Sequence, residues 1–267
     1  MSNTTDILLK ELTNQGVLRL TLNDPERCNA LSEDMLQAMF NALIKAEADP
    51  AVRVVVLCAK GAVFCAGHDL KEINAKCNDA DDGKAFFNVL FSRCSELMQA
   101  IVNIPKTVIA EVNGVATAAG CQLVASCDLA LAAENAKFAT PGVNIGLFCF
   151  TPMVALSRNV SNKHAMEMLL TGDMISATRA EQIGLINRVV NVKELTKQSM
   201  TMANKIANKS SMTLANGKCA FYQQRDMCLT DAYHYASQCM VNNMFKQDAR
   251  EGINAFVKKR HPRWQDK

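Results

Sequence analysis

The stretch from Thr107 to Ser126 constrains the fold more than any other part of this chain of 267 residues. Residues 107–112 form a short apolar run with β-branched side chains, which predicts a buried strand. The glycine-containing turn 113–120 follows, and the small residues 120–126 predict a closely packed helix. A strand, a tight turn and a helix in this order bring unpaired backbone N–H groups and the positive end of a helix dipole to one point. Such a point can hold an anion, or a charge that develops during a reaction.

The order of the remaining predicted elements indicates an α/β fold. Further strands are predicted at residues 7–13, 16–22, 52–59, 128–132 and 186–190. Helices are predicted at residues 33–48, 84–103, 152–158, 163–170 and 177–183 and from residue 193 onward, with Ser32, Asp69, Thr151 and Ser176 as N-caps. Alternation of strands and helices is typical of an α/β core. We therefore expect a core at 1–199 and a helical region at 200–267.

The composition excludes several classes of protein. With 49% apolar and 21% charged residues the chain can bury a sizeable core, and a formal charge of +3 without basic runs does not indicate a nucleic-acid surface. No apolar run approaches the roughly 18 residues of a membrane helix. The four histidines lie far from one another and no C-x-x-C pair occurs, so we expect no metal site.

The cysteines and the N-terminus predict the compartment. Eleven cysteines, an odd number spread along the chain, indicate reduced and mostly buried thiols rather than disulfides. Residues 1–6 contain no basic residue, which argues against a secretory signal or an Arg-rich transit peptide. We therefore expect a cytoplasmic protein.

Several segments in the same order carry a resemblance to a known family. They are the hairpin at 7–22, residues 29–31 (NAL), the loop 66–72 (AGHDLKE), the turn 113–120, the segment 171–186 and the ending 255–260 (AFVKKR). The chain resembles the crotonase, or enoyl-CoA hydratase/isomerase, superfamily over almost its whole length. Residues 138–144 and 146–149 are most similar to the enoyl-CoA hydratase domain-containing protein 3 group.

The resemblance implies a fold and a ligand. The fold is a crotonase-like (ClpP/crotonase) spiral of ββα units, with a C-terminal helical region at 200–267 that mediates trimerisation and covers the coenzyme. The implied assembly is a homotrimer or a dimer of trimers, and the ligand is a coenzyme A thioester, with no permanently bound cofactor. Two backbone N–H groups hold the thioester oxygen in this family, and the alignment assigns them to Ala66 and Ala119. They stabilise the thioester enolate that the superfamily shares.

Two residues depart from the family pattern at the positions that carry its chemistry. Ordinary hydratases place and activate water with two glutamates, and their positions fall on Gln122 and Gly142 here. An amide can orient water but cannot take a proton at neutral pH, and glycine has no side chain. We therefore expect ordinary hydration to be lost. Restoring both glutamates, Gln122→Glu with Gly142→Glu, should raise crotonyl-CoA hydration.

Other groups near the two loops have alternative interpretations. His68 is a general acid or base, or else a loop histidine that faces the adenine pocket or solvent. Asp69 with Glu72 is typical of a helix N-cap, so a structural role for Asp69 is favoured over catalysis. Cys121 and Cys149 are nucleophiles only if activated, and thiols in apolar runs are usually inert.

Residues at both ends of the chain are candidates for binding coenzyme A. By position in the family pattern they are Arg27, Asn29, Ala30, Gly67, His68, Asp69, Leu70, Lys71, Phe256 and Lys259. Each basic residue can instead be an ordinary solvated charge, and Phe256 can belong to a helix packed on the core.

The sequence thus predicts an acyl-CoA enzyme of the enoyl-CoA hydratase/isomerase family that works through an enolate held by backbone N–H groups. Two alternatives stay open. One is a non-catalytic acyl-CoA-binding or regulatory protein of the same fold. The other is an acyl-CoA hydrolase or decarboxylase, in which His68 can take part.

Overall fold

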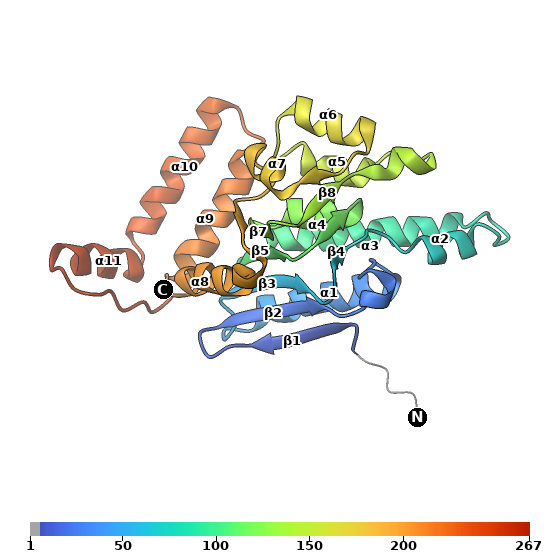
Figure 1. Ribbon diagram of the computed structural model, residues 1–267. Coiled ribbons are helices and arrows are strands. Elements are labelled where there is room, and N and C mark those ends of the chain that lie inside the picture. Colours follow the sequence, from blue (N-terminus) through green and yellow to red (C-terminus); the bar gives the residue numbers. More distant parts are fainter. Residues whose placement is uncertain (1–5) are drawn as a thin grey trace.

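The structure, a computed structural model, describes residues 6–267 as two β-sheets with helices packed around them (Figure 1). The larger sheet has the strand order β1-β2-β3-β5-β7-β10. These strands are Leu8–Leu12, Val17–Leu22, Val54–Ala59, Thr107–Val112, Leu129–Ala133 and Arg188–Val190. β1 and β2 form an antiparallel hairpin, and the other neighbours pair in parallel. The predicted strands of this sheet are confirmed to within two residues at each end.

The larger sheet is buried on both faces because its central strands are apolar at successive positions. Val55 and Leu57 of β3 belong to a core shared with α1 (Glu33–Ala48) and α3 (Lys84–Asn103). Val54 and Val56 belong to a second core, shared with α8 (Leu195–Ala207). An uninterrupted apolar run is what a parallel strand needs when both of its faces are covered.

The smaller sheet is the part of the fold that the sequence did not predict. Its strands are β4 (Val63–Cys65), β6 (Val115–Thr117), β8 (Lys137–Ala139) and β9 (Ile175–Ser176), paired in that order. Runs of two or three residues are too short to show a two-residue hydrophobic period, and their pairing is long-range. This sheet aligns the ends of β4, β6 and β8, from which the loops of the candidate site emerge.

Most predicted helices and caps are confirmed. The shorter helices are α2 (Leu70–Lys76), α4 (Ala119–Ser126), α5 (Phe150–Leu156), α6 (Asn162–Thr171) and α7 (Ala177–Gln182), with 3₁₀ helices at Pro25–Arg27, Pro141–Ile145 and Val192–Glu194. Ser32, Asp69 and Ser176 each accept a backbone N–H of the first turn, as N-caps do. The predicted cap Thr151 is wrong, because α5 begins one residue before it and follows Cys149, whose side chain makes no capping hydrogen bond.

The chain ends in the helices α9 (Ser211–Gln224), α10 (Leu229–Met244) and α11 (Gln247–Val257). α10 and α11 extend away from the sheets, at the end of the molecule opposite α2 (Figure 1). The C-terminal segment returns to the core. There Arg53, the residue before β3, forms an ion pair with Asp266, and its guanidinium nitrogen lies 3.0 Å from the carboxylate oxygen. The Trp264 indole N–H donates to the Asn208 carbonyl at 3.0 Å. Within residues 6–267, no helix is both long and apolar enough to span a lipid bilayer.

The eleven cysteines all lie in the described part of the chain and are free thiols, six of them buried. Of residues 1–6, on which the expectation about a signal or transit peptide is based, residues 1–5 lie outside the described residues.

Candidate functional site

The turn between β6 and α4 is centred on a residue with a sparsely populated backbone conformation. Ala118 has φ 50° and ψ −120°, although it is not glycine. Its N–H donates to the Ala139 carbonyl at 2.9 Å, and its own carbonyl accepts the Gln122 N–H at 3.0 Å. Strain of this kind costs on the order of 1–3 kcal/mol and is found mostly where the surrounding structure enforces it, often at functional sites.

The loop after β4 lies directly against this turn. A Cβ added at Gly67, which has φ 93°, would lie 2.9 Å from the Ala118 Cβ and 3.1 Å from the Ala119 nitrogen. Only glycine allows this close approach without a shift of the backbone. The structure therefore places the two loops singled out in the sequence side by side.

Only one of the two N–H groups assigned by alignment is free to hold a ligand oxygen. Ala119 is the first residue of α4, so its N–H has no partner within the helix. The Ala66 N–H donates to the Cys28 carbonyl at 3.1 Å. The structure therefore contradicts the assignment of Ala66 as an oxyanion donor, since its N–H is already used within the fold.

The next N–H along the loop with the required direction is that of His68. Leu31 forms a parallel bridge to His68, in which the Leu31 N–H donates to the Gly67 carbonyl at 2.8 Å. Across a planar trans peptide bond, the C=O of one residue and the N–H of the next point in opposite directions. The His68 N–H therefore points away from Leu31, and Gly67, the residue before it, lies against Ala118 and Ala119. No backbone acceptor for it lies among residues 6–267.

The two ring nitrogens of His68 are shielded from solvent, although the residue as a whole is partly exposed. Neither nitrogen has a hydrogen-bond partner in the described structure. The ring meets Phe91 of α3 edge-on, with centroids 5.3 Å apart and planes at 85°. Burial lowers the pKa of His68, and the nearby Leu31 carbonyl offsets this only in part. The shielded ring nitrogens favour a role at the site over the alternative of a solvent-facing loop histidine.

Two more buried polar atoms without partners lie next to Ala118. Gln122, 5% exposed, bonds to the Ala118 carbonyl through its backbone, and its side-chain Oε1 is unpaired among the described residues. Thr140 follows Ala139, the acceptor of the Ala118 N–H, and its Oγ1 is likewise buried and unpaired. Buried polar atoms almost always have partners, so a ligand or water is expected here. Sequence reasoning missed Thr140, because nothing in its surroundings along the chain marks it as buried.

The position of the second missing glutamate has no room for a side chain. A Cβ at Gly142 would lie 2.7 Å from the Leu147 carbonyl oxygen and 3.0 Å from the Cys149 sulfur. Burial raises the pKa of the Cys149 thiol, and it raises that of Cys121 to about 12. Both thiols are therefore neutral at neutral pH, and the structure favours packing over a nucleophilic role.

Several predicted coenzyme-binding residues of the first loop are engaged within the protein. Asn29 is fully buried, and its side chain bonds to the Lys60 and Val63 carbonyls and to the Asp24 N–H, at 2.7–2.9 Å. No polar atom of the Asn29 side chain is left to contact a coenzyme, which contradicts that part of the prediction.

The charged residues of the same loop pair with one another. Arg27 bonds to Asp69 and, at 3.1 Å, to Glu72. Asp69 also caps α2, and its pKa is lowered because bonds from the Lys71 and Glu72 N–H groups and the Arg27 charge outweigh the effect of burial. Ala30 is buried, whereas Leu70 and Lys71 are exposed at the start of α2.

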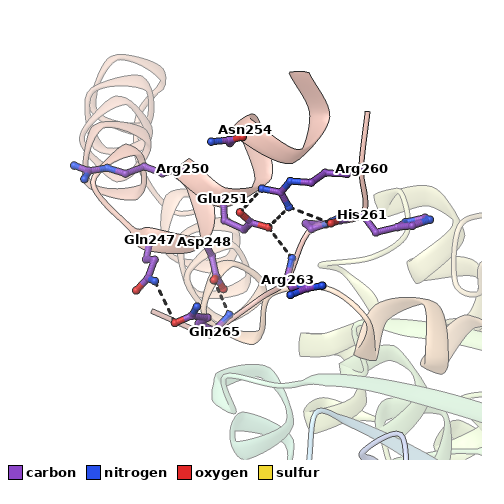
Figure 2. A pocket seen from close by; sticks show the side chains of 10 residues that line it. Gln247, Asp248, Arg250, Glu251, Asn254, Arg260, His261, Arg263 and Gln265 are labelled. Carbon is purple, nitrogen blue, oxygen red and sulfur yellow. Dashed lines mark hydrogen bonds and ion pairs between the residues drawn. The ribbon is translucent and has the colours of Figure 1, made fainter. Parts of the chain in front are cut away.

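The two ends of the predicted coenzyme site are not brought together within one chain. Phe256, 85% exposed, lies on α11, and Lys259 follows it, whereas Arg27 and Lys71 lie near the start of α2 at the opposite end (Figure 1). Figure 2 shows a hollow between α11 and the returning C-terminal segment, where the Arg260 guanidinium bonds to the Glu251 carboxylate at 2.6 and 2.8 Å. Within the described residues, no group of three or more potential metal ligands is present.

Comparison with known proteins agrees with the family resemblance found in the sequence. Residues 12–267 match the family model described as enoyl-CoA hydratase/isomerase. The chain is 46% identical over 249 residues to "Enoyl-CoA hydratase domain-containing protein 3, mitochondrial" of Xenopus laevis, covering 93% of this chain and 83% of the relative. The human protein of the same name is 45% identical over 249 residues, covering 93% and 80%.

Two solved structures of enoyl-CoA hydratase-like proteins are also similar to this chain. The crystal structure of an enoyl-CoA hydratase from Mycobacterium smegmatis superposes with a TM-score of 0.92 at 48% identity, covering 97% of this chain and 98% of that one. That of human enoyl coenzyme A hydratase domain-containing protein 3 has a TM-score of 0.92 at 43% identity, covering 97% and 100%. The curated relatives carry mitochondrial names, so the expectation of a cytoplasmic protein is wrong.

Proposed function

Because this chain belongs to the enoyl-CoA hydratase/isomerase family, we propose that it is an enzyme that binds an acyl-CoA thioester and stabilises its enolate. The observation that carries this proposal is the pair of N–H groups, of His68 and Ala119, that flank the strained turn at Ala118 without backbone partners in the described structure. A thioester oxygen placed between them gains two hydrogen bonds and the positive end of the α4 dipole. Negative charge on that oxygen strengthens all three interactions.

The chemistry at this site differs from ordinary hydration. Gln122 Oε1 and Thr140 Oγ1 can position a water molecule or a polar acyl group, but neither takes a proton at neutral pH. Gly142 offers no side chain and has no space for one. The proposed enzyme therefore forms an enolate without the paired carboxylates that activate water in hydratases.

The coenzyme end of the site requires a second copy of the chain. Phe256 lies on α11 and Lys259 follows it, at the end of the molecule opposite α2, so we assign both residues to the coenzyme held by a neighbouring subunit (Figure 1). Large apolar side chains exposed on the C-terminal helices support a homotrimer or a dimer of trimers; they include Phe221, Leu229, Tyr233, Met240 and Phe245. The core at 1–199 and the helical region at 200–267 stay a proposed division, and the packing of α8 on the sheet favours a boundary just after Ala207.

The proposal is tested by the infrared spectrum of acetyl-CoA labelled with ¹³C at the thioester carbonyl. Bound between two N–H donors, the carbonyl is polarised, and its stretching frequency should fall relative to free acetyl-CoA. S-Ethyl-CoA, which has the same length without the carbonyl, should bind at least ten-fold more weakly.

A second candidate function is favoured by the loss of both glutamates. In that case the protein binds acyl-CoA without turning it over. Tight binding with an unshifted carbonyl frequency would support the binding protein over the enzyme, and no binding at all would reject both.

A further inference from the structure

We propose that the imidazole of His68 removes and returns the α-proton of the thioester whose oxygen is held by the His68 and Ala119 N–H groups. This inference rests on the function proposed above and adds the proton-transfer group that the missing glutamates leave unassigned.

The first support is the position of the ring. His68 carries both the proposed oxyanion N–H and the imidazole, and Gly67, the residue before it, lies against Ala118 and Ala119. The ring is therefore attached to the chain one residue from the contact with the Ala118 turn. The α-carbon of a thioester is bonded to the carbonyl carbon, and a base must therefore lie close to the oxyanion donors. Phe91 holds the ring from the α3 side through the edge-on contact at 5.3 Å.

The second support is the state of the ring nitrogens. Both are buried and have no partner among the described residues, an arrangement that is costly unless a ligand or water supplies one. The remaining polar groups around Ala118 do not compete for this role. Gln122 and Thr140 do not titrate near neutral pH, and burial keeps the Cys121 and Cys149 thiols protonated.

The third support is the protonation state. Burial keeps the imidazole neutral near pH 7 by lowering its pKa, so a basic nitrogen is available. The charged groups on the surrounding elements are paired with one another: Arg27 with Asp69 and Glu72 beside the loop, and Glu33 on α1 with Arg93 on α3. Among residues 6–267, no carboxylate is therefore positioned to hold His68 as an imidazolium.

The proposed step balances without any further reactant. The free lone pair of the imidazole takes the α-proton, and the electrons of the broken C–H bond form the enolate, whose negative oxygen lies between the two N–H groups. The imidazolium then returns a proton to the same carbon and regenerates the thioester. If the ring exchanges its proton with solvent between these events, the α-hydrogens of the substrate exchange with solvent.

The test follows α-hydrogen exchange of acetyl-CoA in D₂O by NMR, using the full-length protein. Acetyl-CoA is chosen because its acyl group is the smallest that carries α-hydrogens. His68→Gln keeps hydrogen-bonding atoms and the backbone N–H but cannot take a proton, and it should slow exchange by about 100-fold or more. His164→Gln, at a partly exposed histidine of α6, is the matched control and should exchange as the wild type does.

The pH profile separates proton transfer from a structural role. Exchange by the wild type at saturating acetyl-CoA should be flat near neutral pH and fall as the pH drops through the lowered pKa of His68, because the protonated ring cannot accept a proton. His68→Gln should lack this acid limb while keeping the affinity and the carbonyl frequency shift.

The outcomes distinguish this inference from the proposed function. A shifted carbonyl frequency with exchange within three-fold of wild type in His68→Gln would overturn the role of His68 alone. A shifted carbonyl with no exchange by the wild type would overturn it equally. An unshifted carbonyl would reject the oxyanion site and, with it, this inference.

Discussion

Gly142 shows how one residue can exclude a reaction. A Cβ at this position would lie 2.7 Å from a backbone oxygen, that of Leu147, which cannot rotate away as a side chain can. Glycine at 142 is therefore part of the way the 3₁₀ turn Pro141–Ile145 packs against the following segment. A glutamate at this position therefore requires a shift of the backbone as well as a change of side chain.

We expect Gly142→Ala to destabilise the protein, because even one added carbon must displace backbone. The expected loss in the free energy of unfolding is about 1–3 kcal/mol. Gly217→Ala is the matched control, since Gly217 lies within α9 with no atom within 4 Å of its added Cβ. That change should stabilise the protein by about 0.5–1 kcal/mol, because alanine is the better helix former. Urea denaturation measures both, and a Gly142→Ala variant as stable as wild type would contradict the close contact.

The same contact changes the expectation for restored glutamates. Sequence alone predicted that Gln122→Glu with Gly142→Glu raises crotonyl-CoA hydration. The structure predicts no gain, because the second glutamate cannot enter without moving the Leu147 carbonyl. The spectrophotometric loss of the crotonyl-CoA double bond measures this, with Gln122→Glu alone as the control. A clear gain in the double variant over the single one would show that the 140–149 segment adapts.

Sequence reasoning succeeded for elements whose pattern is local and failed for those defined by distant pairing. The run at 107–112 and the helix at 84–103 were predicted at their observed limits. The strands β4, β6 and β8 were missed, since three residues carry no periodic signal. Because these strands set the register of the two loops, sequence could place Ala119 at a helix start but could not show that the Ala66 N–H was already bonded.

At the scale of elements, one buried carboxylate adds polar contacts to the apolar packing of α8 on the larger sheet. Glu111 of β5 accepts hydrogen bonds from Arg19 of β2 at 3.0 Å and from Thr196 of α8 at 2.9 Å, and it also bonds to Ser199. Burial opposes ionisation of Glu111, but these bonds outweigh it and lower the pKa of the carboxyl. A charge buried in this way is costly to leave unpaired.

We expect Glu111→Gln to lower the free energy of unfolding at pH 7 by about 3 kcal/mol, because Arg19 loses its charged partner. Since folding lowers the pKa of Glu111, its contribution is fully present above the ordinary glutamate pKa near 4.3 and is lost as pH falls through the folded value. The variant should therefore lose less stability than wild type as the pH falls below about 4.3. A single carboxyl accounts for at most about 1.4 kcal/mol of this difference per pH unit.

Unfolding curves at several pH values test this expectation. Glu26→Gln, at an exposed residue of the first 3₁₀ helix, is the control and should change stability by less than about 0.5 kcal/mol. If the free energy of unfolding changed with pH by the same amount in wild type and in Glu111→Gln, Glu111 would not be held ionised by its partners.

At the scale of the whole molecule, the resemblance to the enoyl-CoA hydratase/isomerase family is confirmed. One end of the molecule leaves a group of large apolar side chains exposed to solvent. α10 exposes Leu229 by 75%, Tyr233 by 70% and Met240 by 64%, and Phe245 directly after it by 70%. Side chains of this size are seldom left in contact with water in such a group. The same end of the chain carries Phe256 and Lys259, which one copy does not bring near its own α2 loop (Figure 1). Assembly and coenzyme binding are therefore expected to depend on each other.

We expect the wild-type protein to sediment as a trimer or a hexamer, and Met240→Glu with Phe245→Glu to shift it toward the monomer, because the charges would have to be buried in the interface. Ile44→Glu, at a similarly exposed apolar residue of α1, should leave the assembly unchanged. If Phe256 and Lys259 act on the coenzyme of a neighbouring copy, the monomeric variant should also bind acetyl-CoA at least ten-fold more weakly. Sedimentation velocity and calorimetry measure the two effects. A wild-type monomer, or a monomeric variant with unchanged affinity, would show that one chain holds the coenzyme alone.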